Sequence, residues 1–204
     1  MHPNRIFRGQ AETEILEFSS EQAFGVLSMA ATPFPLTSHV PFIITEDKKS
    51  VEFHLASNNP MRALLAEPAP VSLSVMGPHA YISPDWYGLE DQVPTWNYVA
   101  TQICGHAVEM PKDWLIDHLD RLSTEMENRL LPKKPWTTRK MDAKKFKAMR
   151  NGIFGVKLEI EKLDGTWKLN QNKPAEARKG AANGLAEVNE QGSQQISALM
   201  KAGL

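Results

Sequence analysis

Short segments in which apolar and polar residues alternate fill the first two thirds of the chain, and they constrain its fold more than any other feature. In residues 51–55 the three odd-numbered positions are apolar, whereas Glu52 and His54 are polar. This two-residue period places the apolar side chains on one face of a strand and the polar ones on the other. The turn at residues 46–49 connects this strand to the one before it, a pattern typical of an antiparallel hairpin.

The remaining segments extend this pattern. A stripe of apolar residues at three- and four-residue intervals, which includes His118, predicts a long helix over 112–130. Because strands dominate and helices are inserted between them, the sequence predicts a mostly β fold, a closed or half-closed antiparallel barrel flanked by helices. Strands are expected at 24–29, 36–45, 51–55, 71–76, 80–83, 95–109, 153–163 and 167–169; helices are expected at 11–22, from Asn58-Asn59-Pro60, at 112–130, at 142–150 and after Pro174; a turn is expected at Asp164-Gly165.

Composition narrows the class of protein. The chain has 204 residues, 42% of them hydrophobic, and a formal net charge of −1. Such a chain can bury one sizeable core, and it lacks the strong positive charge of a dedicated nucleic-acid binder. Cys104 is the only cysteine, which excludes an intrachain disulfide and a cysteine-rich zinc site. Neither a signal-peptide pattern nor an apolar run of membrane-spanning length is present, so we expect a soluble cytoplasmic protein with no membrane partner.

Aromatic residues are concentrated between positions 81 and 98. This stretch holds all three tyrosines of the chain, together with Trp86 and Trp96. One interpretation is a packed core or a subunit interface, where aromatic side chains are common. The other is a stacking surface for a flat ligand, with Thr95 and Asn97 as polar groups that orient it.

Three segments in order carry a family resemblance. Residues 77–87 (GPHAYISPDWY), 93–98 (VPTWNY) and 167–172 (WKLNQN) resemble signature segments of the PaiB-type family of FMN-binding negative transcriptional regulators. The resemblance covers about residues 1–185, which we expect to form one split-barrel domain, and residues 186–204 are expected to form a helical tail. Weaker family patterns occur in the right order at Phe24–Leu27, Ser38–Pro41, His54–Ala56 and Asn59-Pro60.

The resemblance implies a split β-barrel that binds FMN, forms a homodimer with the flavin near the subunit boundary, and represses transcription. Two positions depart from the family pattern. Asn170 stands where a serine is usual, and Ser57 stands where an arginine is usual. Because arginine is a natural partner of phosphate, other donors must replace it here. The amides at the helix start, Asn59-Pro60-Met61, and the side chain of Arg62 are the candidates.

A flavin in such a barrel defines the expected site. We expect its phosphate near the second and third strands and the helix start, and its ring near the second and third signature segments. The predicted cofactor-binding residues are Ser38, His39, Asn59 and Arg62 for the phosphate, and Trp96, Asn97, Lys168 and Gln171 for the ring.

Other functions are compatible with parts of the same sequence. A flavin-dependent oxidoreductase on the same fold stays open, as does a haem protein with His39, His54 or His79 as axial ligand. No Gly-x-Ser-x-Gly elbow and no metal-ligand histidine spacing are present, so no catalytic residue and no metal site are predicted. The basic stretch 133–150 is either a solvated surface or a contact for DNA phosphates or an acidic partner. Without a recognisable reading element, we expect any contact with DNA to be weak.

Overall fold

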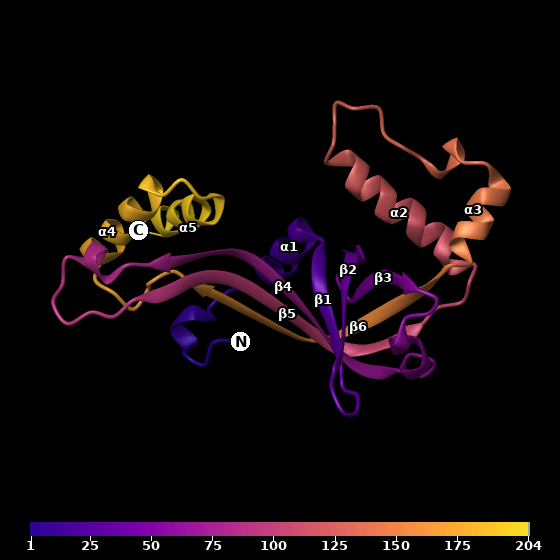
Figure 1. Cartoon of the computed structure of the whole chain (residues 1–204), viewed down its shortest axis with the longest axis horizontal. Helices are drawn as coiled ribbons and strands as arrows, with labels where there is room; N and C mark the ends of the chain where they lie inside the picture. The colour runs from indigo at the N-terminus through magenta and orange to yellow at the C-terminus, as the bar shows by residue number, and fades with distance from the viewer. Residues whose placement is uncertain (204) are drawn as a thin grey trace. The chain divides into compact units, whose positions relative to one another are not determined.

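The structure is a computed structural model that describes residues 1–203, and the chain divides into two compact units. The first unit contains residues 1–15, 75–102 and those from 164 on, and the second contains residues 16–74 and 103–163. The helices are α1 (Glu12–Gln22), α2 (Trp114–Asn128), α3 (Ala143–Arg150), α4 (Ala175–Glu187) and α5 (Gln191–Ala202), and the strands are β1 (Phe24–Met29), β2 (Leu36–Ile44), β3 (Ser50–Ala56), β4 (Ala69–Ile82), β5 (Thr95–Glu109) and β6 (Ile153–Lys168), as labelled in Figure 1.

The second unit carries a closed antiparallel barrel. Its strand order is β1-β2-β3-β6-β5-β4, and the ladder between β1 and β4 closes the circle. The predicted fold class, a mostly β split barrel with flanking helices, is therefore confirmed. Alternation along β3 fills the interior, because Val51 and Phe53 point inward and lie opposite Leu158 and Val156 of β6. Each large apolar side chain buried in this way contributes about 1.5–3 kcal/mol. The fully buried side chains of the barrel include Leu27, Phe42, Val51, Phe53, Leu73, Ile103, Val156 and Leu158.

Helices α2 and α3 belong to an excursion between β5 and β6 (Figure 1). The predicted apolar stripe is confirmed within α2, where Leu115, His118 and Leu122 are buried, but Leu130 lies beyond the end of the helix and is exposed. Trp114 at the start of α2 lies directly over Gly155 of β6, where an added Cβ would come within 2.5 Å of the indole ring. The helix therefore rests on the outer face of the barrel, on the side formed by β3 and β6.

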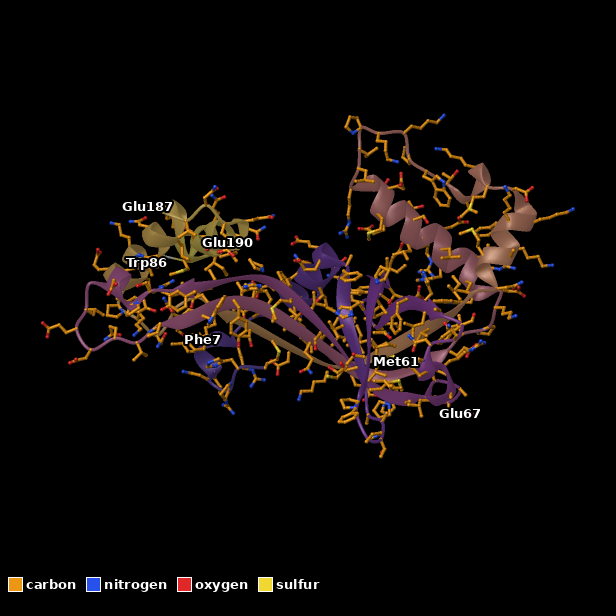
Figure 2. The ribbon with its side chains drawn as sticks, viewed as in Figure 1. Phe7, Met61, Glu67, Trp86, Glu187 and Glu190 are labelled. Atoms are coloured by element: carbon orange, nitrogen blue, oxygen red, sulfur yellow. The ribbon has the colours of Figure 1, made fainter. Side chains whose placement is uncertain are left out.

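The first unit has a core of its own. Helices α4 and α5 pack together over the aromatic signature segment, and Trp86 (Figure 2) lies against Gly184 of α4. The segment after residue 185, predicted to be helical, contains α5, and its Ile196 and Met200 are fully buried. A domain boundary at residue 185 stays a prediction. The core of this unit consists of Ala80, Ile82, Tyr87, Leu169, Ala177, Ala181, Ala182, Leu185, Ile196 and Met200.

Two expectations about strands were wrong. The predicted strands 71–76 and 80–83 are one strand, β4, which continues through Gly77 and Pro78. Proline removes a ladder donor, but β1 pairs with β4 only over residues 71–74, so Pro78 lies beyond that ladder. The predicted turn at Asp164-Gly165 is likewise strand, since β6 runs on to Lys168.

The reason for the second error is a packing role of Gly165. An added Cβ there would lie 2.7 Å from the ring of Trp167 and 2.9 Å from Cγ1 of Ile15. Glycine is therefore needed within β6 because side chains of β6 and of α1 approach it closely, and this requirement resembles a turn signal when only the sequence is seen.

We expect Gly105→Ala to destabilise the barrel strongly. Gly105 of β5 faces the backbone of β6, and an added Cβ would lie 1.8 Å from the carbonyl oxygen of Glu159. Because backbone must move to admit the methyl group, the free energy of unfolding should fall by about 1–3 kcal/mol or more in urea denaturation. Gly9→Ala is the matched control, since no atom of the described residues lies within 4 Å of its Cβ position. Equal stability of the two variants would contradict the expected crowding.

Candidate functional site

Ser38 and Asn59 form the first part of the candidate site, in the second unit. Asn59 caps the short 3₁₀ helix Pro60–Leu64, where its side-chain oxygen accepts a hydrogen bond from the amide of Met61 at 3.0 Å. Its Nδ2 donates to the hydroxyl of Ser38 in β2 at 2.8 Å. Since that hydroxyl already accepts one bond, its own hydrogen is left to donate to a ligand. The cap therefore orients Asn59, and Asn59 orients Ser38.

Ser57, at the position where the family usually has arginine, takes no part in this donor set. Its hydroxyl donates to the backbone oxygen of Asn151 at 3.0 Å. His39, the next predicted phosphate residue, is exposed and stacks on Phe24 with ring centroids 6.3 Å apart. The predicted free amides at the helix start are also fewer than expected. Pro60 has no N–H, and the side chain of Asn59 occupies the amide of Met61.

Arg62 lies in the same 3₁₀ helix, and it is held by a carboxylate. Its Nε and Nη2 donate to the two carboxylate oxygens of Glu109 at 3.0 and 2.7 Å, and its guanidinium lies 5.1 Å from the ring centre of Phe154. The hydrogen bonds from Arg62 to Glu109 raise the pKa of Arg62 above its ordinary value. Its backbone N–H donates to the carbonyl of Asn59 at 3.1 Å. Any anion that approaches Arg62 must therefore share it with Glu109.

Lys168, in the first unit, is fixed by two oxygens. Its Nζ donates to the hydroxyl of Thr95 and, at 2.6 Å, to the backbone oxygen of Trp96. Partial burial lowers the pKa of Lys168 from its ordinary value. The lysine is thus a localised cation beside the second signature segment, rather than a freely moving surface side chain.

Asn97 and Gln171 have structural roles in the first unit. Asn97 is fully buried and its Nδ2 donates to the sulfur of Met200 at 3.4 Å, while its Oδ1 has no hydrogen-bond partner in the part of the chain that the structure describes. Gln171 closes its own turn, accepting from the amide of Leu169 at 2.8 Å and donating to the oxygen of Trp167 at 2.5 Å. Both side chains therefore stabilise the framework around the signature segments.

The aromatic stretch 81–98 is partly packed core and partly exposed surface, so each of the two interpretations of the sequence applies to part of it. Tyr87 is buried in the core of the first unit, whereas Trp96 and Tyr81 have exposed fractions of 54% and 49%. The rings of His79 and Tyr81 lie 5.7 and 6.2 Å from the ring of Trp96. One part of the stretch is core, and the other presents an exposed aromatic surface.

Sequence reasoning missed two polar contacts in the second unit. One is Glu109, the partner of Arg62, for which the sequence gives no signal because the two residues are 47 positions apart. The other is a pair of imidazoles, with Nδ1 of His54 3.2 Å from Nε2 of His118. Their signal was available, since alternation places His54 on the outer face of β3 and periodicity places His118 on the apolar stripe of α2. Neither pattern alone shows that the two faces meet.

Among residues 1–203, no cluster of three or more His, Cys, Asp or Glu side chains is arranged to hold a metal ion. In the same part of the chain no helix is both long and apolar enough to cross a bilayer.

The chain is similar to a protein family, to a bacterial relative and to proteins of known structure. Residues 1–162 match the family model described as "Putative FMN-binding domain". The chain is 29% identical, over 98% of its length and 97% of the relative's, to "Protease synthase and sporulation protein PAI 2" of Bacillus subtilis. A FAD- and haem-binding protein of Mycobacterium smegmatis has a similar fold, with a TM-score of 0.57 and 13% identity over 79% of this chain and 73% of that one. A conserved hypothetical protein of Mycobacterium tuberculosis also has a TM-score of 0.57, with 13% identity over 85% of this chain and 94% of that one.

Proposed function

Because the chain belongs to the FMN-binding domain family whose model matches residues 1–162, we propose that it is a flavin-dependent regulator of the PaiB type, in which FMN acts as a signal. The predicted family and the predicted cofactor are confirmed by that match. When bound, FMN supplies a ring that accepts one or two electrons. The regulatory role is favoured by the near full-length similarity to the Bacillus subtilis sporulation protein.

The observation that carries the proposal is the donor set around the helix start at Pro60. Ser38 has a hydroxyl hydrogen left to donate, Asn59 holds that hydroxyl in place, and Arg62 adds a cation in the same short helix. A phosphate buried without such donors would be very unstable, so a phosphate-bearing ligand in this unit should bind where they lie. His39 stays a predicted member of this group, and Trp96, Asn97, Lys168 and Gln171 stay the predicted residues for the flavin ring.

Glu109 gives the proposed phosphate site a specific property. The carboxylate already occupies two donors of Arg62, and it repels an incoming phosphate. Arg62 keeps unused N–H groups, since a guanidinium has five. Phosphate binding at this position therefore depends on a balance between one ion pair and a competing anion.

We expect Arg62→Ala to weaken FMN binding by roughly 10- to 150-fold, the range for loss of a hydrogen bond to a charged group. Titration of FMN into the apo protein, followed by flavin fluorescence, measures the change in Kd. Arg139→Ala is the matched control, because Arg139 lies in the exposed connection between α2 and α3. Glu109→Gln should change the affinity in the opposite direction. Equal dissociation constants for Arg62→Ala and the parent protein would remove Arg62 from the site.

The homodimer expected from the family resemblance has a candidate surface in the first unit. Trp96 and Tyr81 are half exposed and their rings are in contact, so this surface leaves a large aromatic area in water. Exposed aromatic clusters are typical of interfaces, and a two-fold dimer is the commonest assembly. We propose that a second copy of the chain covers this surface.

A charge placed on this surface should separate the subunits. Light scattering at micromolar concentration is expected to give the mass of a dimer for the parent protein and of a monomer for Trp96→Glu, because the carboxylate would be buried unpaired. Phe34→Glu is the control, since Phe34 is also an exposed aromatic residue, at 76%, but belongs to the second unit. A parent protein that is only monomeric would sink the proposal.

The basic stretch 133–150 is the proposed contact for DNA. It contains one acidic residue, Asp142, and its cations are mostly exposed, with Lys133 engaged by Glu127. Helix α3 is only eight residues long, and its lysines are exposed to solvent. None of its residues is buried, so it is not packed on the domain as a recognition helix would be. The cationic residues of the stretch are Lys133, Lys134, Arg139, Lys140, Lys144, Lys145, Lys147 and Arg150.

We expect DNA binding through this stretch to be weak, salt-sensitive and indifferent to sequence. Fluorescence anisotropy should give a Kd on the order of 10⁻⁴ to 10⁻⁶ M at physiological salt. Replacing Lys144 and Lys147 with alanine should reduce the dependence of log K on log salt by about 0.9 for each phosphate that is no longer neutralised. Nanomolar, sequence-selective binding would contradict this expectation.

A further inference from the structure

Helix α2 contacts the barrel at two neighbouring residues, one on β3 and one on β6. His54 of β3 and Gly155 of β6 are register partners, and both face α2. Trp114 lies over Gly155, and the same indole ring stacks on His118 with centroids 4.7 Å apart and planes 9° apart. His118 in turn reaches His54 at 3.2 Å. The contact therefore joins two strands of the barrel to the first two turns of the helix.

Polar groups continue this contact into a buried row. Glu52 is 5% exposed although it is charged, and its carboxylate lies 2.6 Å from Arg121 of α2. Nδ1 of His118 is fully buried and has no hydrogen-bond partner among residues 1–203, and a carboxylate oxygen of Glu52 lies 3.8 Å away. The arrangement with the best electrostatics has His54 donating its Nδ1 hydrogen to Nε2 of His118, which leaves the Nδ1 hydrogen of His118 facing Glu52.

The charged groups around the imidazole pair provide no counter-ion for a second imidazolium. From α2, Asp117 and Arg121 are paired with each other at 2.7 Å. From β6, Lys157 is the register partner of Glu52 and lies on the same face, while from β2 the partner of Glu52 is the apolar Ile43. The carboxylate of Glu52 faces His118 at 3.8 Å, and Arg121 already neutralises that carboxylate at 2.6 Å. A positive charge on His54 in addition to one on His118 therefore meets a like charge 3.2 Å away, without a carboxylate of its own among the described residues.

We propose that His54 and His118 form an acid-released latch, in which proton uptake by the imidazole pair separates α2 from β3 and frees the basic stretch that follows the helix. Two imidazolium rings cannot remain 3.2 Å apart in a site from which water is largely excluded. Because the polypeptide passes from α2 directly into residues 133–150, release of the helix would also change how that positive surface is presented. This inference concerns control by protons, and it goes beyond both flavin binding and the contact with DNA.

The direction of the pH effect follows from linkage. Burial, and then the neighbouring His118, lower the pKa of His54 from 6.5 to about 4. The opened state therefore binds more protons than the seated one between these two values. The contact between α2 and β3 is fully stable above about pH 6.5 and loses stability as the pH falls towards 4.

Amide hydrogen exchange of the full chain tests the latch. For a group whose pKa moves from about 6.5 to about 4, linkage predicts that protection factors in α2 fall by roughly 25-fold between pH 7.5 and pH 5. Amides of β1 and β2 are the internal reference and should keep their protection. His54→Asn retains a side-chain amide that can bond to His118 but cannot titrate, so protection in α2 should change less than about 3-fold over the same range.

A second variant distinguishes pH-dependent release of α2 from a general weakening of its contact with the barrel. Gly155→Ala places a methyl group 2.5 Å from the ring of Trp114, so it should lower protection in α2 by the same factor at both pH values. If His54→Asn is unfolded, NMR titration of the His54 ring in the parent protein serves instead, with a midpoint near pH 4 to 5 and simultaneous shifts of α2 amides as the expected result. Constant protection in the parent protein, an equal loss in a folded His54→Asn, or a ring midpoint near 6.5 without α2 shifts would overturn the proposal.

Discussion

The ladder between β1 and β4 is the interaction on which the rest of the structure depends. It pairs residues 26–29 with residues 71–74 and so closes a sheet that would otherwise have two free edges. Closure satisfies the backbone groups of both edge strands and encloses the apolar faces of all six strands in one interior. It also imposes close approaches between strands, of which Gly105 against Glu159 is the tightest.

Because the interior of the closed barrel is filled by apolar side chains, the polar side chains of the strands lie on its outer face. The same alternation that turns Phe53 inward turns Glu52 and His54 outward, where α2 covers them. A polar face covered by a helix must provide its own hydrogen bonds and charges, because water no longer does so. The row from Glu52 through His118 to His54 fulfils that need, and in the proposed latch it makes the contact sensitive to protonation of the imidazole pair.

In the proposed phosphate site, a neighbouring residue supplies the positive charge that the usual arginine would provide. Loss of the usual family arginine at Ser57 does not leave this part of the barrel without a cation, because Arg62 lies five residues later in a short helix. Arg62 is however neutralised by Glu109, so the site combines a fixed pair of neutral donors, Ser38 and Asn59, with a cation that is shared. Such a site favours a ligand able to displace part of an ion pair, and it makes affinity dependent on a carboxylate that does not itself contact the phosphate.

Local patterns in the sequence determined the strands, the apolar stripe of α2, the Asn59 cap and the family, because each of these depends on residues close together along the chain. The same patterns misplaced Gly165 and Pro78. A glycine needed for packing and a proline beyond a ladder differ from turn residues only in what lies opposite them. Tertiary structure alone decided that Glu109 meets Arg62, that Asn97 is buried against Met200, and that the outer face of β3 meets the stripe of α2 at His54 and His118. These contacts join residues 47, 103 and 64 positions apart. The closed barrel sets the distances for the first and third contacts, and the packing of α5 in the core of the first unit sets the second, so no local pattern can relate the segments.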